Sequence, residues 1–178
     1  MEQVRIITEK IYKMIYVLYG QPGSGKSTLG KLLAGYLDTP FIIDGDEFRG
    51  MFKNKDYGFG GRKKNIRAAN AVATYLNKKG KDGDWKAIYI DVINGWESRP
   101  VNKETHVVMT LVNPYEQFRE ELKEDNNEQV REVLLFSRRD LRKEYHVKDF
   151  ETGVPDCKMN TDREAEDSFD YLKTLLNI

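Results

Sequence analysis

One stretch of the chain has the residue types and spacing needed to hold phosphate groups. It fits the pattern G-x-x-x-x-G-K-[ST] and consists of Gly20, Gln21, Pro22, Gly23, Ser24, Gly25, Lys26 and Ser27. The glycines let backbone N–H groups turn toward phosphate oxygens, and a helix starting there adds the positive end of its dipole. We expect Lys26 to reach the β- and γ-phosphates of ATP, the Ser27 hydroxyl to bind Mg²⁺, and Thr28 to lie near the α-phosphate. The motif predicts a nucleoside triphosphate site and leaves open a switch, a motor or a kinase.

A second group of charged side chains follows the short apolar run 41–43. Asp44, Asp46 and Arg49 come directly after it. Because the carboxyl ends of parallel strands meet at one edge of a sheet, these side chains are expected near the γ-phosphate. One aspartate would orient an acceptor hydroxyl, Asp46 would hold Mg²⁺, and Arg49 would bind an anionic acceptor. The alternative is that Asp44 only caps the helix that follows it.

Basic residues are concentrated in two blocks. Residues 60–81 contain seven lysines and arginines and no acidic residue. On the predicted helix 62–79, Arg62, Asn65 and Arg67 are expected to face the cleft, and the Phe59 ring is either a base-stacking or a loop-anchoring group. The second block, 137–143, predicts a mobile basic lid within roughly residues 130–150.

The elements that must position these residues alternate between strand-like and helix-like patterns. Apolar runs at 14–19, 41–43, 87–93 and 107–112, with a weaker one at 157–160, predict strands. Helical periodicity covers 26–37, 62–79 and 167–176, and another helix is expected from Pro114 through 116–123, followed by a loop at 124–129. The order predicts one α/β domain with a mainly parallel five-stranded sheet and helices on both faces.

Composition limits the classes of partner. The 178 residues suffice for one domain, and the 29 basic and 29 acidic residues cancel. Such a balance argues against binding nucleic acid or membranes by bulk charge. A single cysteine excludes an intrachain disulfide, and no apolar run is long enough to span a membrane, so we expect a cytoplasmic protein. Residues 1–13 leave a helix, an extra strand or a homodimer contact open.

These residues resemble the adenylyl-sulfate kinase family, whose members are also called APS kinases. The matching segments are the phosphate loop, Asp44-Gly45-Asp46-x-x-Arg49, residues 54–59, Arg62-x-x-Asn65-Ile66-Arg67, the Asn113-Pro114 corner and Asn160-Thr161-Asp162. The resemblance implies a single-domain P-loop kinase fold with a mobile basic lid. It also implies transfer of the γ-phosphoryl group of Mg·ATP to the 3′-hydroxyl of adenylyl sulfate, a small nucleotide of sulfate assimilation.

The same resemblance suggests roles for individual residues. Asp44 matches an aspartate near the 3′-hydroxyl, and Phe59 matches a ring near the acceptor adenine. Arg67 matches the first of two paired arginines. The acceptor-binding positions are matched by Arg49, Arg62 and Asn65. The basic lid is represented by Arg138, Arg139, Arg142 and Lys143, followed by an aromatic–glutamate pair, Phe150-Glu151.

The chain departs from the family pattern at three places, and two of them, the turn after the third strand and the lid, leave the acceptor open. The Ser-Pro-aromatic-Arg turn expected after the third strand reads Asn94-Gly95-Trp96-Glu97, where Trp96 would line the acceptor pocket or pack in the core. Asp91 stands where the family has serine, as a carboxylate for Mg²⁺ or a strand-end cap. The lid reads Ser137-Arg138-Arg139-Asp140 instead of the family's Lys-Lys-Ala-Arg.

Other functions therefore stay open beside the APS kinase reaction. The acceptor would be another small anionic nucleotide derivative or, given the basic block, a polynucleotide 5′-hydroxyl. A non-catalytic nucleotide switch is the third alternative. Against a guanine-specific switch, the stretches beginning at Asn54 and Asn77 both lack the final Asp of Asn-Lys-x-Asp.

Overall fold

The central feature of the molecule is a parallel sheet of five strands in the order β2-β5-β1-β6-β7. The computed structural model describes residues 13–79, 86–91, 95–100, 106–127, 129–139 and 141–178, without side chains for 79–105. The strands are β1 (Ile15–Tyr19), β2 (Ile42–Asp44), β5 (Val107–Leu111), β6 (Val130–Phe136) and β7 (Cys157–Asn160). The α/β class and the number of strands in the predicted sheet are confirmed.

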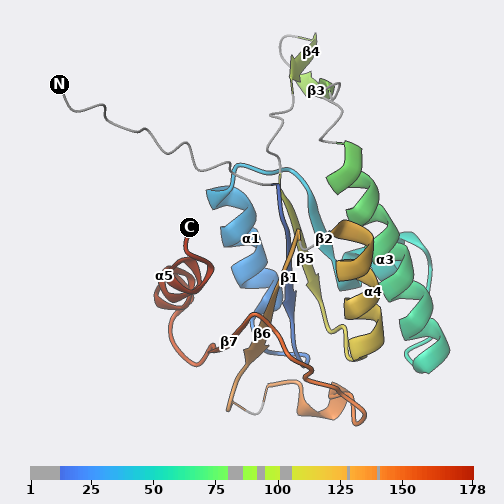
Figure 1. The fold of residues 1–178 in the computed structure, drawn as a ribbon, viewed down its shortest axis with the longest axis vertical. Helices are drawn as coiled ribbons and strands as arrows, with labels where there is room; N and C mark the ends of the chain where they lie inside the picture. The colour runs from blue at the N-terminus through green and yellow to red at the C-terminus, as the bar shows by residue number, and fades with distance from the viewer. Residues whose placement is uncertain (1–12, 80–85, 92–94, 101–105, 128, 140) are drawn as a thin grey trace.

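Helices cover both faces of this sheet (Figure 1). α1 (Lys26–Tyr36) and α5 (Ala165–Leu176) lie on one face, and α3 (Phe59–Lys79) and α4 (Glu116–Asn126) lie on the other. The short α2 (Gly45–Met51) follows β2 directly, and a single 3₁₀ turn, η1, spans Lys143–Tyr145. α4 extends three residues beyond the predicted end and stops at Asn127, whose φ of 48° is left-handed.

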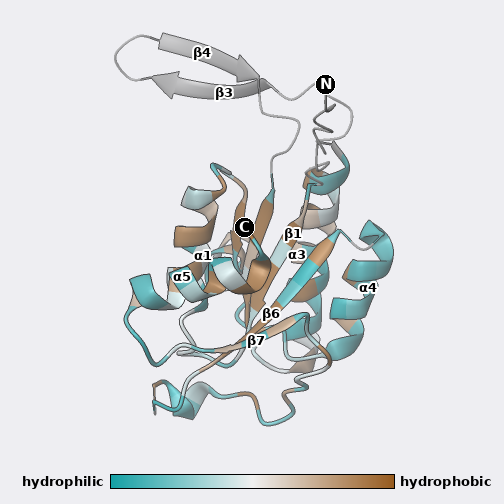
Figure 2. Ribbon diagram, turned by 60° about the vertical axis from the view of Figure 1, so that its left-hand side comes forward, coloured by the Kyte–Doolittle hydropathy of each residue, from teal (hydrophilic) through white to brown (hydrophobic). Residues whose placement is uncertain are grey.

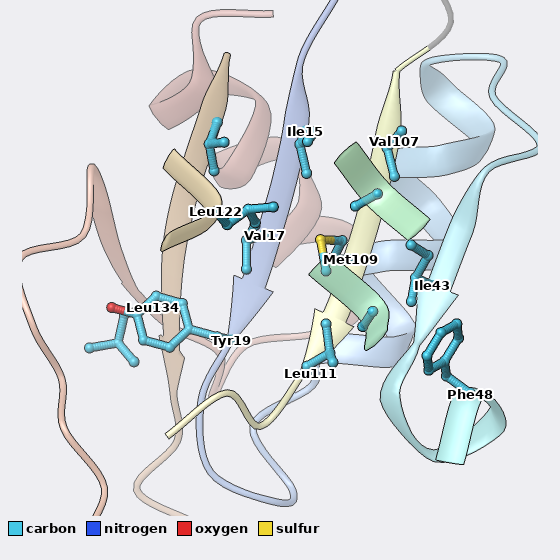
Figure 3. Close-up of a cluster of buried hydrophobic side chains, with 13 residues drawn as sticks. Ile15, Val17, Tyr19, Ile43, Phe48, Val107, Met109, Leu111, Leu122 and Leu134 are labelled. Atoms are coloured by element: carbon cyan, nitrogen blue, oxygen red, sulfur yellow. The ribbon is translucent and has the colours of Figure 1, made fainter. Parts of the chain in front are cut away.

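Alternation along the central strand divides the core into two layers. Ile15, Val17 and Tyr19 of β1 pack toward α3 and α4, as Figure 3 shows for the cluster they form. Tyr16 and Leu18 pack on the opposite face, toward α1 and α5. All five residues are buried because β1 is central and covered on both sides. The carboxyl end of this rigid strand leads directly into the phosphate loop.

The prediction of which strands form the sheet was partly wrong. The predicted strand at 87–93 corresponds to β3 (Lys86–Asp91), which pairs antiparallel with β4 (Gly95–Pro100) and with no other described strand. The fifth place in the sheet belongs to β6, which we had assigned to the lid. Part of β6 is hydrophilic in Figure 2, because Arg131 and Glu132 interrupt its apolar pattern. Glu132 is nevertheless buried, since Arg119 and Lys123 of α4 pair with it.

None of the helices in the described part of the chain is both long and apolar enough to cross a bilayer.

Candidate active site

The phosphate loop joins β1 to α1 in the geometry that its motif requires. Gly23 (φ 85°) and Gly25 (φ 82°) have left-handed backbones that other residues rarely adopt. Gly25 is the N-cap of α1, and no side chain caps that helix. The start of α1 therefore presents backbone N–H groups and the positive end of its dipole to the loop, which suits an anion.

Lys26 folds back over the loop. Its Nζ donates to the carbonyl oxygen of Gln21 at 2.7 Å and to Ser24 Oγ at 3.3 Å. Burial, with a smaller contribution from Arg142, lowers the pKa of Lys26 to about 8, although the Asp46 and Asp44 carboxylates act in the opposite direction. The charges of the two aspartates after β2 and of Arg142 in the lid therefore act on this ammonium, and a bound triphosphate would stabilise its charged form.

Asp44 connects three elements at the carboxyl edge of the sheet. Its Oδ1 accepts from the backbone N–H groups of Asp46 (3.0 Å) and Glu47 (3.4 Å), so it caps α2. Its Oδ2 accepts from Ser27 Oγ at 2.6 Å and from Thr110 Oγ1 at 2.9 Å. Burial raises the pKa of Asp44, but these four hydrogen bonds outweigh it and leave the pKa below its ordinary value. The carboxylate is therefore charged at neutral pH.

Ser27 and Asp44 supply the kind of oxygen ligands that Mg²⁺ prefers. Mg²⁺ in phosphate sites is commonly held by one or two protein oxygens together with phosphates and waters. Among the described residues, no group of three or more His, Cys, Asp or Glu side chains is arranged to hold a metal ion, but a Mg²⁺ site of this kind does not need one. The Ser27 hydroxyl donates to Asp44, and the metal residues predicted from the sequence were Ser27, Asp46 and Asp91.

A cavity of about 1140 Å³ opens beside these groups. Its walls come from the phosphate loop, the start of α2, the first turns of α3, the end of β5 and the lid. Lining residues that we predicted as site residues are Pro22, Gly23, Gly25, Lys26, Ser27, Thr28, Asp44, Asp46, Arg49, Arg62, Asn65, Arg139 and Arg142. Donor-side and acceptor-side candidates from distant parts of the chain therefore share one space.

The two acceptor-side arginines also hold the segment before α3. Arg49 Nη1 donates to the carbonyl oxygen of Asp56 at 2.7 Å, and its guanidinium lies 4.5 Å from the Tyr57 ring centre. Arg62 Nε donates to the carbonyl oxygen of Tyr57 at 2.7 Å. A guanidinium has five N–H donors, so both side chains retain donors for an anion in the cavity.

The segment predicted as a lid starts only at Ser137, because the first residues of its predicted range, 130–136, form β6. Asp162 accepts from Ser137 Oγ at 2.6 Å and from the backbone N–H of Arg138 at 3.0 Å. Hydrogen bonds from Ser137 and Asn160 hold the pKa of Asp162 down at about 2. Arg139 Nη2 donates to the Thr161 carbonyl at 2.7 Å. The Asn160-Thr161-Asp162 segment thus anchors the first residues of the lid.

Comparison with known proteins identifies the fold. The chain matches the solved structure of the Mycobacterium tuberculosis APS kinase in complex with AMPPNP and APS with a TM-score of 0.68 at 19% identity, covering 94% of this chain and 99% of that one. A gluconokinase from Sinorhizobium meliloti matches with a TM-score of 0.59 at 15% identity, covering 93% of each chain. Shikimate kinase from Aquifex aeolicus matches with a TM-score of 0.52 at 16% identity, covering 92% of this chain and 96% of that one. The chain has a P-loop kinase fold.

Comparison by sequence matches a smaller part of the chain. The Zeta toxin family matches residues 2–72, which hold the phosphate loop, α2 and the first part of α3. No curated protein sequence matches the chain. The structural matches therefore show the P-loop kinase fold and leave the acceptor to be inferred from the cavity.

Several residues carried over from the APS kinase resemblance lie outside the large cavity. Arg67 forms a bidentate pair with Glu121 on the surface between α3 and α4, at 2.7 and 3.2 Å. Phe59 is 54% exposed and packs edge-on against Tyr115. Phe150 stacks on Tyr19 and lines a neighbouring cavity of about 540 Å³. Arg138 lines neither of these cavities.

Asp91 and Trp96 belong to β3 and β4, and their side chains lie outside the described residues. We had placed both at the carboxyl edge of the main sheet, but β3 is not a strand of that sheet. The third strand of the sheet along the chain is β5. The turn after it is Asn113-Pro114-Tyr115, which contains the proline–aromatic pair that we had sought at 94–97.

Asn113 and Thr110 also line the cavity, and we had not assigned either to the site. Asn113 has a left-handed backbone (φ 42°) and is 1% exposed. Neither polar atom of its side chain has a hydrogen-bond partner among the described residues, and the same is true of Asn65 Oδ1. The Asn-Pro pair after a predicted strand was the sequence signal for this corner, but it did not show that β5 lies next to β2.

The pKa of Lys26 predicts that MgATP binding takes up protons near pH 8. With a pKa of about 8, half of the Lys26 side chains are neutral there, and the triphosphate would raise the pKa. We expect an uptake of about half a proton per MgATP at pH 8 and almost none at pH 6.5. Calorimetry in buffers of different ionisation enthalpy measures this uptake. Equal uptake by a Lys26→Met variant would contradict the assignment.

Proposed function

We propose that the protein is an ATP-dependent kinase that transfers the γ-phosphoryl group to a hydroxyl of a small anionic acceptor. The 3′-hydroxyl of adenylyl sulfate is the first candidate. The observation that carries this proposal is the shared cavity, which is lined by Lys26 and Ser27, by the Asp44 carboxylate, and by arginines from α2, α3 and the lid. Such a site aligns two substrates and neutralises the charge on the transferred group.

On the donor side, the loop N–H groups and Lys26 would bind the β- and γ-phosphates. Ser27 and Asp44 would hold Mg²⁺, which would neutralise charge that develops on the phosphate oxygens. Arg139 and Arg142 line the same cavity from the lid and would contribute positive charge there.

On the acceptor side, a carboxylate would receive the hydroxyl proton. As the acceptor oxygen bonds to the γ-phosphorus, the bond from that phosphorus to the β–γ bridging oxygen breaks and ADP leaves. With Asp44 on Mg²⁺, Asp46, which also lines the cavity, would orient the hydroxyl and take its proton. Arg49 and Arg62 would bind the anionic part of the acceptor.

A second candidate is a hydroxyl acceptor that contains no adenine. Phe59 and Arg67, two residues matched to the APS kinase pattern, lie outside the cavity. The carboxamides of Asn65 and Asn113 are buried beside it with unpartnered atoms, which is unfavourable until a polar group satisfies them. Hydroxyl groups would do so, and a gluconokinase and a shikimate kinase share the fold.

A coupled ADP-release assay with Mg²⁺, ATP and a panel of acceptors tests the proposal. The panel contains adenylyl sulfate, other nucleotide derivatives, gluconate and shikimate. We expect one acceptor to raise ADP release about 100-fold above hydrolysis by water, because the site must align that hydroxyl with the γ-phosphate. If adenylyl sulfate gives only the water background, the APS kinase assignment fails. If every acceptor does, the kinase proposal fails.

Asp44→Asn is the companion variant in this assay. Asparagine caps helices about as well as aspartate, so α2 is retained while the negative charge beside Ser27 is lost. Acceptor-dependent turnover should fall about 100-fold while ATP still binds. Unchanged turnover would remove Asp44 from the reaction.

A further inference from the structure

The variable positions of the phosphate loop are fastened to the lid. Gln21 Nε2 donates to the carbonyl oxygen of Val147 at 2.9 Å, and the Val147 N–H donates back to Gln21 Oε1 at 2.8 Å. The next loop residue, Pro22, has its carbonyl oxygen 3.1 Å from His146 Nε2. Above Gly23 the lid is so close that a Cβ there would lie 2.5 Å from the carbonyl oxygen of Leu141. Three consecutive loop residues thus contact both ends of lid segment 141–147.

The lid residues between these contacts face the large cavity. Arg142, Glu144 and Tyr145 line it. Arg142 is near enough to Lys26 to lower the pKa of that ammonium. Its backbone is left-handed (φ 54°), which is unfavourable for an arginine and persists only where neighbouring contacts impose it. The position of Arg142 therefore depends on how segment 141–147 is held.

Gln21 is the side chain suited to hold this segment. A carboxamide can accept from an N–H and donate to a carbonyl at the same time, as one strand does to another. Val147 is 7% exposed, so without Gln21 its N–H and carbonyl would be left buried without these partners. The phosphate-loop motif places no requirement on this position, which is one of its x residues.

We propose that Gln21 is a positioning residue that latches the lid to the phosphate loop and thereby holds Arg142 beside the γ-phosphate during transfer. This inference rests on the proposed kinase function. The latch has two consequences. It places the positive charge of Arg142 beside the negative charge of the transferred phosphoryl group, and it keeps the lid over the donor so that water does not replace the acceptor.

Gln21→Met tests the latch, because methionine has a similar length and removes both hydrogen bonds. Amide exchange of Val147, followed by NMR, should accelerate about 10-fold, since its N–H loses the Gln21 acceptor. The kcat for transfer should fall about 10-fold and ATP hydrolysed per acceptor phosphorylated should rise, while the affinity for MgATP changes less than about twofold. ATP affinity should persist because the loop binds phosphate through backbone groups and Lys26.

The matched control is Gln117→Met, the same chemical change on the exposed face of α4. It should leave Val147 exchange, kcat and the hydrolysis ratio unchanged, and exchange of the Val17 amide in β1 reports that each variant is folded. Val147 exchange in Gln21→Met equal to wild type would overturn the latch. Faster exchange with unchanged kcat and hydrolysis ratio would overturn its positioning role. Failure of the proposed function would give a different result: Val147 amide exchange would still accelerate in Gln21→Met, but the wild-type protein would phosphorylate no acceptor in the panel.

Discussion

Lys26→Met should lower kcat for phosphoryl transfer about 1000-fold, the upper end of what loss of a single charge-stabilising donor costs. The Lys26 ammonium donates hydrogen bonds to Gln21 and Ser24 of the phosphate loop. These contacts hold it where the β- and γ-phosphates would bind. Methionine is an unbranched side chain one atom shorter than lysine and carries no charge. The measurement is acceptor-dependent ADP release at saturating ATP, with ATP affinity determined in parallel.

Lys31→Met is the matched control, because Lys31 lies on the exposed side of the same helix. It should retain wild-type turnover. Turnover by Lys26→Met within about tenfold of wild type would contradict a role for this ammonium in the transition state.

Lys26→Met should not destabilise the fold. Burial lowers the pKa of Lys26, so the folded protein disfavours the charged form relative to the unfolded chain. That unfavourable contribution is fully present below pH 8 and is relieved as pH rises from about 8 to 10.5. Urea unfolding should therefore show wild type gaining stability relative to Lys26→Met across this range. If wild type instead lost stability relative to Lys26→Met, burial would not be the dominant cause of the lowered Lys26 pKa.

The second large effect is expected from Arg119→Met, which should lower the free energy of unfolding by about 3–5 kcal/mol. The guanidinium is 1% exposed and lies 3.8 Å from Glu132 and 4.4 Å from the ring centre of Tyr19. It also donates to the carbonyl oxygens of Asn113 at 2.7 Å and Glu151 at 3.0 Å. Removing it leaves Glu132, whose pKa burial already raises, with Lys123 as its remaining cationic partner among the described ion pairs.

Arg131→Met provides the comparison for this prediction. Arg131 pairs with Asp156 at 3.4 Å on the protein surface, so its loss should change stability by less than about 1 kcal/mol. Urea unfolding of both variants measures the difference. Adding Glu132→Gln to Arg119→Met should recover part of the loss, because it removes the buried charge. Equal stability of the Arg119 and Arg131 variants would contradict the importance of the buried pair.

Arg119 also explains why sequence analysis did not predict β6 as a strand of the sheet. A charged residue inside a strand normally indicates a solvent-facing position, and Glu132 therefore argued against burial of β6. Its partners come from α4, which no local pattern connects to residues 130–136. By contrast, the run at 87–93 has the β-branched composition of a strand, but composition does not specify which partner a strand takes.

The phosphate loop, most of the helices and four of the five sheet strands could be predicted from sequence, because each depends on residues that are neighbours in the chain. Glycines, a lysine and a serine at fixed spacing, between an apolar run and a helical period, are sufficient to specify the loop. The continuous apolar run 14–19 likewise predicts a strand, and the structure buries both of its faces. Local covalent connectivity determines these features, and the structure confirmed the predicted fold class.

The acceptor side was decided only by the tertiary structure. Arg67 and Arg62 lie five residues apart on α3, yet one pairs with Glu121 of α4 while the other lines the cavity. Thr110 and Asn113 entered the site because β5 lies beside β2, and Gln21 contacts Val147 across 126 residues. Contacts between segments distant in the chain depend on strand order and helix packing, which the pattern of a single segment does not encode. The sequence by itself therefore determined the phosphate loop between a strand and a helix, and the packing of remote segments decided which side chains line the cavity beside it.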